Sequence, residues 1–213
     1  GWWVPEYVIK GDPAKGIKPL APDLRSVSDL PRYKDVFKDP EAPTKGRFLN
    51  SPIGWTSEVV NKQKLKAYGL DDSYVNFRSG SGAALDAEIS SSIHRGKPVL
   101  FYYWSPTPLL GRFKLIQLEE PPFDAEAWKT LTDADNPNPR PTRSLASKLS
   151  IGVSTPFQKQ YPQIAEFFAR VDFPIDPLNK ALAEMSEKHT PPRQAAQAFM
   201  KAHPDVWRAW LPK

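Results

Sequence analysis

The sequence predicts an α/β fold in which a mixed or mostly parallel sheet is layered by helices. Three observations lead to this class. Apolar runs of strand length alternate with segments of helix length along the first half of the chain. Gly69 and Gly96 stand where two of these helices should end. The run 97–104, KPVLFYYW, is apolar without interruption, which is typical of a strand covered on both faces.

The elements of the first half follow in a regular order. Strands are predicted over 1–9, 45–50, 74–78 and 97–104. Helices are predicted over 26–37, from Thr56 or Ser57 to Gly69, and over 79–96. Ser28 or Asp29 is expected to cap the first helix and Ser79 or Ser81 the third. The third helix should bury one apolar stripe, formed by Leu85, Ile89 and Ile93.

The second half is richer in helix. Strands are predicted over 114–123 and 149–155, with a polar loop at 133–144 between them. Helices are predicted over 160–171, over 176–189 with Asp176 as cap, and over 191–211 with a break at Pro204. One or two strands with three helices make a poor independent domain, because the apolar stripes of the helices need a sheet to cover. The predicted division is therefore a complete domain over 1–112 and a partial one over 113–213.

Composition excludes several classes of function. The 29 Lys and Arg are scattered among 24 acidic residues, and the net charge is only +5, so nucleic-acid binding is not predicted. The chain has no cysteine, which removes disulfides and thiolate chemistry and is consistent with an oxidising compartment. No apolar stretch approaches the ~20 residues of a membrane helix.

Enzymatic chemistry has little support in the sequence. The three histidines, His94, His189 and His203, lie near the ends of separate predicted helices. No HExxH, GxSxG or metal-spaced carboxylate cluster is present. The pair Glu119 and Glu120 is expected to be a solvated loop edge. We therefore predict no enzyme activity, no metal and no cofactor.

One turn has the character of a binding site. A strand ends at Asn50, Gly54 makes a tight turn, and a helix begins near Thr56 or Ser57, so free backbone N–H groups and the helix dipole should face one point. This arrangement suits an anion. Trp55 lies in the turn itself, and Trp104 ends the next covered strand at the same expected edge of the sheet.

Two indoles beside an N–H cluster suit a zwitterion. An aromatic face attracts a poorly hydrated cation such as trimethylammonium, while the N–H groups hold the anionic end. The alternative is that Trp55 and Trp104 cap the core of the domain. An amino-acid ligand would call for a carboxylate near the indoles, and neither tryptophan loop contains one.

Five stretches, in this order and spacing, resemble the glycine betaine/proline-type substrate-binding proteins of ABC transporters, which are type II periplasmic binding proteins. They are GWWVPEYV, NSPIGWTSE, SGSGAALDAEI, GKPVLFYYWSP and LIQLEEPPF, and the final AAQAFMKAHPDVWRAWL is similar as well. The resemblance implies two α/β lobes that close on a quaternary ammonium compound. It implies that Trp55 and Trp104 box the cation, and that the N–H groups of Trp55, Thr56 and Ser57, after Gly54, clamp the carboxylate.

The same resemblance implies the setting of the protein. Residues 1–112 would be lobe two and 113–213 the C-terminal portion of lobe one, with the first part of lobe one expected on a preceding segment. The ligand would be glycine betaine, choline, carnitine or proline betaine, the compartment periplasmic or otherwise extracytoplasmic, and the partner an ABC permease of the inner membrane. The alternative is a truncated or diverged member that acts as a structural or interaction protein, with oligomer formation or element exchange through the incomplete lobe.

Overall fold

The computed structural model describes residues 1–212, which form two compact units. The first unit consists of Gly1–Trp104 and Phe113–Leu145, and the second of Ser105–Arg112 with the chain from Ala146 onward. This division differs from the predicted boundary at residue 112. Residues 113–145 lie in the first unit because the strand that they contain pairs with the first strand of the sheet. The assignment of lobes to these units stays a prediction.

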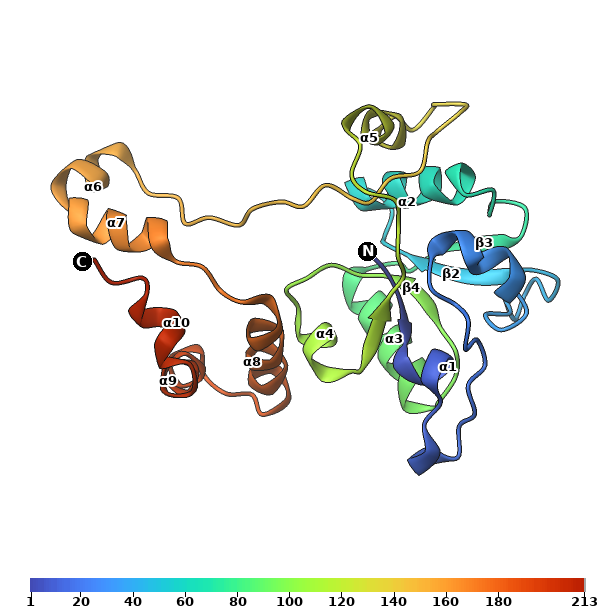
Figure 1. Ribbon diagram of the computed structural model, residues 1–213, viewed down its shortest axis with the longest axis horizontal. Coiled ribbons are helices and arrows are strands. Elements are labelled where there is room, and N and C mark those ends of the chain that lie inside the picture. Colours follow the sequence, from blue (N-terminus) through green and yellow to red (C-terminus); the bar gives the residue numbers. More distant parts are fainter. Residues whose placement is uncertain (213) are drawn as a thin grey trace. The chain divides into compact units, whose positions relative to one another are not determined.

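The first unit is built on a five-stranded sheet of order β3-β2-β4-β1-β5 (Figure 1). Its strands are β1 (Trp2–Pro5), β2 (Gly46–Asn50), β3 (Tyr74–Arg78), β4 (Leu100–Tyr102) and β5 (Leu115–Gln117). β2 pairs in parallel with β3 and β4, whereas β1 runs antiparallel to β4 and β5. The sheet is therefore mixed, and its parallel part is the βαβ portion that the sequence predicted.

Helices α2 (Thr56–Ala67) and α3 (Gly82–His94) connect the parallel strands and lie on opposite sides of the sheet (Figure 1). The order β3-β2-β4 requires this arrangement when both crossovers have the usual right hand. The Ser81 hydroxyl caps α3 by accepting from the Ala84 N–H at 3.1 Å, which confirms one of the two predicted caps. Gly69 and Gly96 follow the helices with φ of 63° and 65°, as predicted for C-terminal glycines.

The antiparallel part contains more short helices than predicted. Residues 1–9 are a strand only as far as Pro5, after which the chain forms α1 (Glu6–Lys10). A 3₁₀ turn, η1, follows at Pro13–Lys15. Helix α5 (Ala125–Thr132) was not predicted; it is capped by Asp124, which accepts from the Ala127 N–H at 2.7 Å, and it packs against α2.

The predicted helix at 26–37 is the 3₁₀ segment η2 (Val27–Tyr33), whose N-cap is Ser26, not Ser28 or Asp29. Asp29 is instead the residue at N3 that accepts from the Ser26 N–H at 2.9 Å. This hydrogen bond is the main reason that the pKa of Asp29 lies below its ordinary value of 3.8; burial opposes the shift.

Replacing Asp29 by alanine should lower the free energy of unfolding by about 1 kcal/mol at neutral pH. The pKa of Asp29 is depressed in the folded protein, so this contribution is complete above pH 3.8 and is lost as the pH falls through the folded pKa. Urea unfolding at several pH values measures the difference. Asp23→Ala, at an exposed aspartate of the preceding segment, is the control. A difference between wild type and Asp29→Ala that does not shrink in acid would contradict the assignment.

The core of the first unit lies on both sides of β2 and β4. Trp2 is fully buried and stacks on Phe48, with ring centroids 4.1 Å apart. The predicted stripe on α3 is confirmed, since Leu85, Ile89 and Ile93 are all buried. These contacts fix the rigid frame from which the loops at the strand ends project.

The core also contains an ion pair formed by Glu120, so the prediction that this residue is solvated is wrong. The Glu120 side chain is 4% exposed and accepts from the ammonium of Lys64, whose side chain is fully buried, at 2.5 Å. Glu119, in contrast, is exposed. The sequence shows two adjacent acidic residues before Pro121. Only tertiary packing makes one side chain buried and the other exposed, because Glu120 pairs with Lys64 of α2.

The regular elements of the second unit are all helices among its described residues. Its helices are α4 (Pro108–Arg112), α6 (Thr155–Gln160), α7 (Pro162–Arg170), α8 (Ile175–Glu187), α9 (Pro192–Ala202) and α10 (Pro204–Arg208). The break predicted at Pro204 is confirmed. The predicted cap of α8, Asp176, is wrong: Pro174 is the N-cap, the helix begins at Ile175, and Asp176 lies in its first turn. Gly111 of α4 approaches the backbone of α8 so closely that a Cβ would lie 2.0 Å from the Asn179 carbonyl oxygen.

The strand predicted over 149–155 is wrong. Residues 149–154 have no regular structure, and α6 begins at Thr155. Leu149, Ile151 and Val153 are exposed. A strand needs a neighbour for its N–H and C=O groups, and among the described residues this segment has no strand beside it. Nor does any helix within residues 1–212 combine the length and apolar character needed to cross a membrane.

Candidate functional site

The three parallel strands β2, β3 and β4 end at one edge of the sheet, at Asn50, Arg78 and Tyr102. The loops that follow carry the two predicted tryptophans. The rings of Trp55 and Trp104 contact edge to face, with centroids 5.3 Å apart and planes at 69°. Each residue is 38% exposed, so neither belongs to the core. The structure thus brings together two residues that are 49 positions apart in the sequence.

The backbone around Trp55 explains its exposed position. Trp55 has extended φ and ψ of −87° and 139° at the N-cap position of α2. Gly54 before it has a φ of +93°, which favours glycine and turns the chain away from the strand. Across the loop, a Cβ on Gly82 would lie 3.3 Å from Cη2 of Trp55. The start of α3 is therefore a close neighbour of the indole.

Trp104 is supported by the residue before it. The buried ring of Tyr103 stacks on the indole, with centroids 4.5 Å apart and planes at 15°. The Tyr103 hydroxyl donates to Oδ1 of Asp86 on α3 at 3.1 Å. The sequence analysis does not predict a role for Tyr103 or Asp86. The Asp86 carboxylate comes from α3, an element separate from the two tryptophan loops. The aromatic run at 101–104 was the available signal for Tyr103.

The predicted anion-binding groups lie at the start of α2. The Trp55 N–H donates to the Pro52 carbonyl at 3.3 Å. Thr56 and Ser57 occupy the first two positions of the helix, where N–H groups have no partner within the helix. The positive end of the helix dipole is at the same place. These features suit an anion, and Thr56 is exposed while Ser57 is half-buried.

A buried carboxylate lies in the same turn of α2. The side chain of Glu58 is 9% exposed, and its Oε1 atom accepts no hydrogen bond. Nη1 of Arg78, at the end of β3, is 3.6 Å from that oxygen. The guanidinium therefore partly compensates a negative charge next to the anion-binding amides.

A buried polar network holds the loop 51–57 from inside the unit. The Asn50 side-chain amide donates to the Glu58 carbonyl at 3.1 Å and accepts from the Ser51 N–H at 2.7 Å. Asn61 of α2 donates to the same Asn50 oxygen at 2.8 Å. Because both Asn50 and Asn61 are buried, loss of either amide would leave unpaired polar groups. The network fixes the end of β2 against the first turns of α2.

Hydroxyl groups continue this network towards β4. The hydroxyls of Ser51 and Ser57 are 2.8 Å apart. Burial raises the pKa of the Tyr102 phenol, and a hydrogen bond with the Ser57 side chain opposes that shift. Ser57 therefore links the start of α2 to β4, the strand that precedes Trp104.

Residues 1–212 contain no group of three or more His, Asp or Glu side chains that could hold a metal ion. His94 and His189 are exposed, whereas His203 is half-buried.

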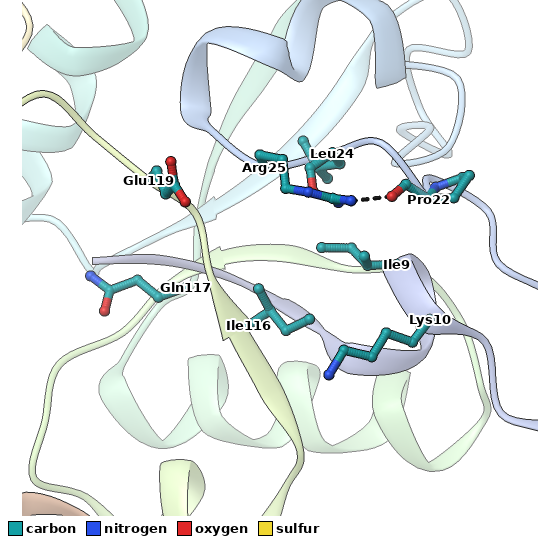
Figure 2. Close-up of a pocket in the computed structure, with 8 residues that line it drawn as sticks. All are labelled: Ile9, Lys10, Pro22, Leu24, Arg25, Ile116, Gln117 and Glu119. Carbon is teal, nitrogen blue, oxygen red and sulfur yellow. Dashed lines mark hydrogen bonds between the residues drawn. The ribbon is translucent and has the colours of Figure 1, made fainter.

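Figure 2 shows a pocket of about 320 Å³ elsewhere in the first unit, between α1, the segment before η2 and β5. Its lining residues are Ile9, Lys10, Pro22, Leu24, Arg25, Ile116, Gln117 and Glu119. None of the predicted ligand-binding residues lines it. Its two cations already have partners, since Arg25 donates to the Pro22 carbonyl at 2.7 Å and Lys10 to Glu6 at 2.7 Å. The indole pair, and not this pocket, is therefore the candidate site.

Comparison with known proteins points to one family. Residues 1–202 match the family described as the substrate binding domain of ABC-type glycine betaine transport systems. A trimethylamine N-oxide-binding protein of Pelagibacter ubique is 25% identical over 194 residues, which are 91% of this chain and 59% of that protein. The glycine betaine/proline betaine-binding periplasmic protein of Escherichia coli is 27% identical over 181 residues, which are 83% of this chain and 52% of that protein.

Solved structures agree on the fold. The crystal structure of lactococcal OpuAC in its closed-liganded conformation with glycine betaine gives a TM-score of 0.57 at 15% identity, and the match covers 100% of this chain and 66% of that one. This likeness confirms the predicted α/β fold of a type II periplasmic binding protein. The chain spans a little over half the length of the curated relatives that it matches.

Proposed function

Because the chain belongs to the family of substrate-binding domains of ABC-type glycine betaine transport systems, we propose that it captures a quaternary ammonium compound for an ABC importer. The observation that carries this proposal is the exposed pair Trp55 and Trp104 beside the first turn of α2. The ligand class is glycine betaine, choline, carnitine or proline betaine. No bond of the ligand is made or broken; binding only favours the ligand-bound conformation.

The indole pair is the proposed site for the cationic head. A trimethylammonium group has no N–H to donate, so hydrogen-bond acceptors cannot hold it well. Aromatic faces can, by ~0.5 to 2 kcal/mol for each contact. The exposure of both rings supports this role, because a ring that only filled the core would be buried.

The start of α2 is the proposed site for the anionic end. The N–H groups of Thr56 and Ser57 belong to the first turn of a twelve-residue helix, and Gly54 and Trp55 place that turn beside the indoles. A carboxylate or an N-oxide oxygen could accept from these groups. Choline, which lacks an anionic group, would use the aromatic pair without this second contact.

The proposed setting is extracytoplasmic. Two of the family's features support it: relatives are named periplasmic binding proteins, and the family serves ABC transport systems. We propose a permease in the inner membrane as the partner.

Ligand binding by the full-length protein tests the proposal. A ligand that binds only the folded state raises the melting temperature, by the equivalent of about 2.7 kcal/mol at 100 times Kd. We expect glycine betaine, choline or trimethylamine N-oxide to raise it, and calorimetry to give a saturable heat. Glycine, which lacks the methyl groups, is the matched control and should have no effect. If none of the methylated amines changes the melting temperature or gives heat, the proposal fails.

A further inference from the structure

A carboxylate adjoins the aromatic cluster at the cation end of the proposed site. Asp86 lies in the second turn of α3, half-buried, and accepts from the Tyr103 hydroxyl at 3.1 Å. The Tyr103 ring in turn covers one face of Trp104 at 4.5 Å, nearly parallel to it. Asp86, Tyr103 and Trp104 therefore form a chain of contacts from α3 to the exposed indole. The loops of the two tryptophans contribute no acidic residue of their own.

This chain of contacts has two physical consequences. The hydrogen bond fixes the orientation of the Tyr103 ring, and the stacked ring limits the positions that Trp104 can take. The carboxylate also places a full negative charge on the Tyr103 side of the stack. A cation on the indole would be attracted by this charge, because the interaction between two charges falls only with the first power of distance.

Neighbouring charges do not cancel this effect by direct pairing. Arg78, at the end of β3, has its own acidic partner, Glu58, at 3.6 Å. Arg47, near the start of β2, contacts Asp39 at 2.6 Å and Glu88 of α3 at 3.6 Å. Asp86 is bonded instead to a neutral phenol. Its charge is thus available to the surroundings of the indole pair.

We propose that Asp86 is a positioning residue that makes the site selective for a cation: it orients Trp104 through Tyr103 and supplies a negative charge beside the indole pair. The inference rests on the proposed function and deepens it, because it identifies a source of charge selectivity in addition to the indoles. The indole faces already favour a cation. The carboxylate adds a preference for positive charge.

The test compares two ligands of the same shape that differ in charge, choline and neutral 3,3-dimethylbutan-1-ol, with the full-length protein. Asp86→Asn keeps an acceptor for the Tyr103 hydroxyl but removes the charge. We expect it to weaken choline binding roughly threefold to tenfold and to leave the neutral alcohol unchanged. Asp72→Asn, at an exposed aspartate before β3, removes the same charge at the other end of the strand and should change neither.

A second variant separates orientation from charge. Tyr103→Phe keeps the stacked ring and the carboxylate but removes the hydrogen bond between them, so both ligands should weaken by the same factor, roughly twofold. An Asp86→Asn variant that binds choline as the wild type does, or that weakens both ligands equally, overturns the inference while the proposed function stands. A wild type that binds neither choline nor glycine betaine overturns the proposed function, and the inference with it.

Discussion

Replacing Lys64 by methionine should lower the free energy of unfolding by about 3 to 5 kcal/mol, the largest effect on stability that we expect in this chain. Lys64 and Glu120 are both buried and pair at 2.5 Å, with Tyr68 and Ser144 as further hydrogen-bond partners. Burial lowers the pKa of Lys64, and the charge of Glu120 opposes that shift. Methionine fills a similar volume but leaves the Glu120 carboxylate buried without a cation.

The urea midpoint, followed by circular dichroism, measures this loss. Lys62→Met is the matched control, because Lys62 lies two positions earlier on the same helix with an exposed side chain, and its change should stay within about 0.5 kcal/mol. The double variant Lys64→Met with Glu120→Leu removes both charges and should recover most of the loss. If the single variant costs less than about 1 kcal/mol, the pair is not buried as described.

Replacing Trp104 by alanine should weaken the binding of glycine betaine by roughly 10- to 100-fold, the largest effect on binding that we expect. The change removes one of the two aromatic faces proposed for the cation and the edge-to-face contact with Trp55. Stability should change much less, because Trp104 is 38% exposed. Trp104→Phe keeps a smaller aromatic face and should recover part of the affinity.

Calorimetry with the full-length protein measures this affinity. Trp128→Ala is the matched control: Trp128 lies on α5, its ring is tilted against Phe123, and it is not part of the indole pair. We expect this control to bind glycine betaine as the wild type does. Wild-type affinity in Trp104→Ala would show that the indole does not contact the ligand, and the cation would then need another site.

Local signals in the sequence located most of the parallel part of the sheet. The strand at β2, the helices α2 and α3 and the glycines after them were predicted because propensity, capping and burial pattern agree there. The segment 149–155 shows the opposite case. Its alternating apolar residues suit a strand, but a strand forms only where a neighbour completes its hydrogen bonds, and local sequence does not report that neighbour.

The candidate site also has features that local sequence predicts and contacts that it does not. The turn at Gly54 and Trp55, and the position of Trp104 close to the end of β4, could be predicted because they depend on residues close in the sequence; the strand itself ends at Tyr102. The partners of these residues could not. Asp86 reaches Tyr103 from α3, and Gly82 adjoins the Trp55 ring, because two crossover helices begin near one edge of the sheet.

The sequence by itself determined the α/β class, the main helices and strands of the first unit, and the exposed tryptophan of the turn, since each follows from periodicity and from the backbone preferences of glycine, serine and proline. Only the tertiary structure decided that the two indoles touch, that Glu120 is buried against Lys64 and that Asp86 adjoins the aromatic cluster. These contacts join residues 17 to 56 positions apart, and they arise from the packing of whole elements, which no local pattern encodes.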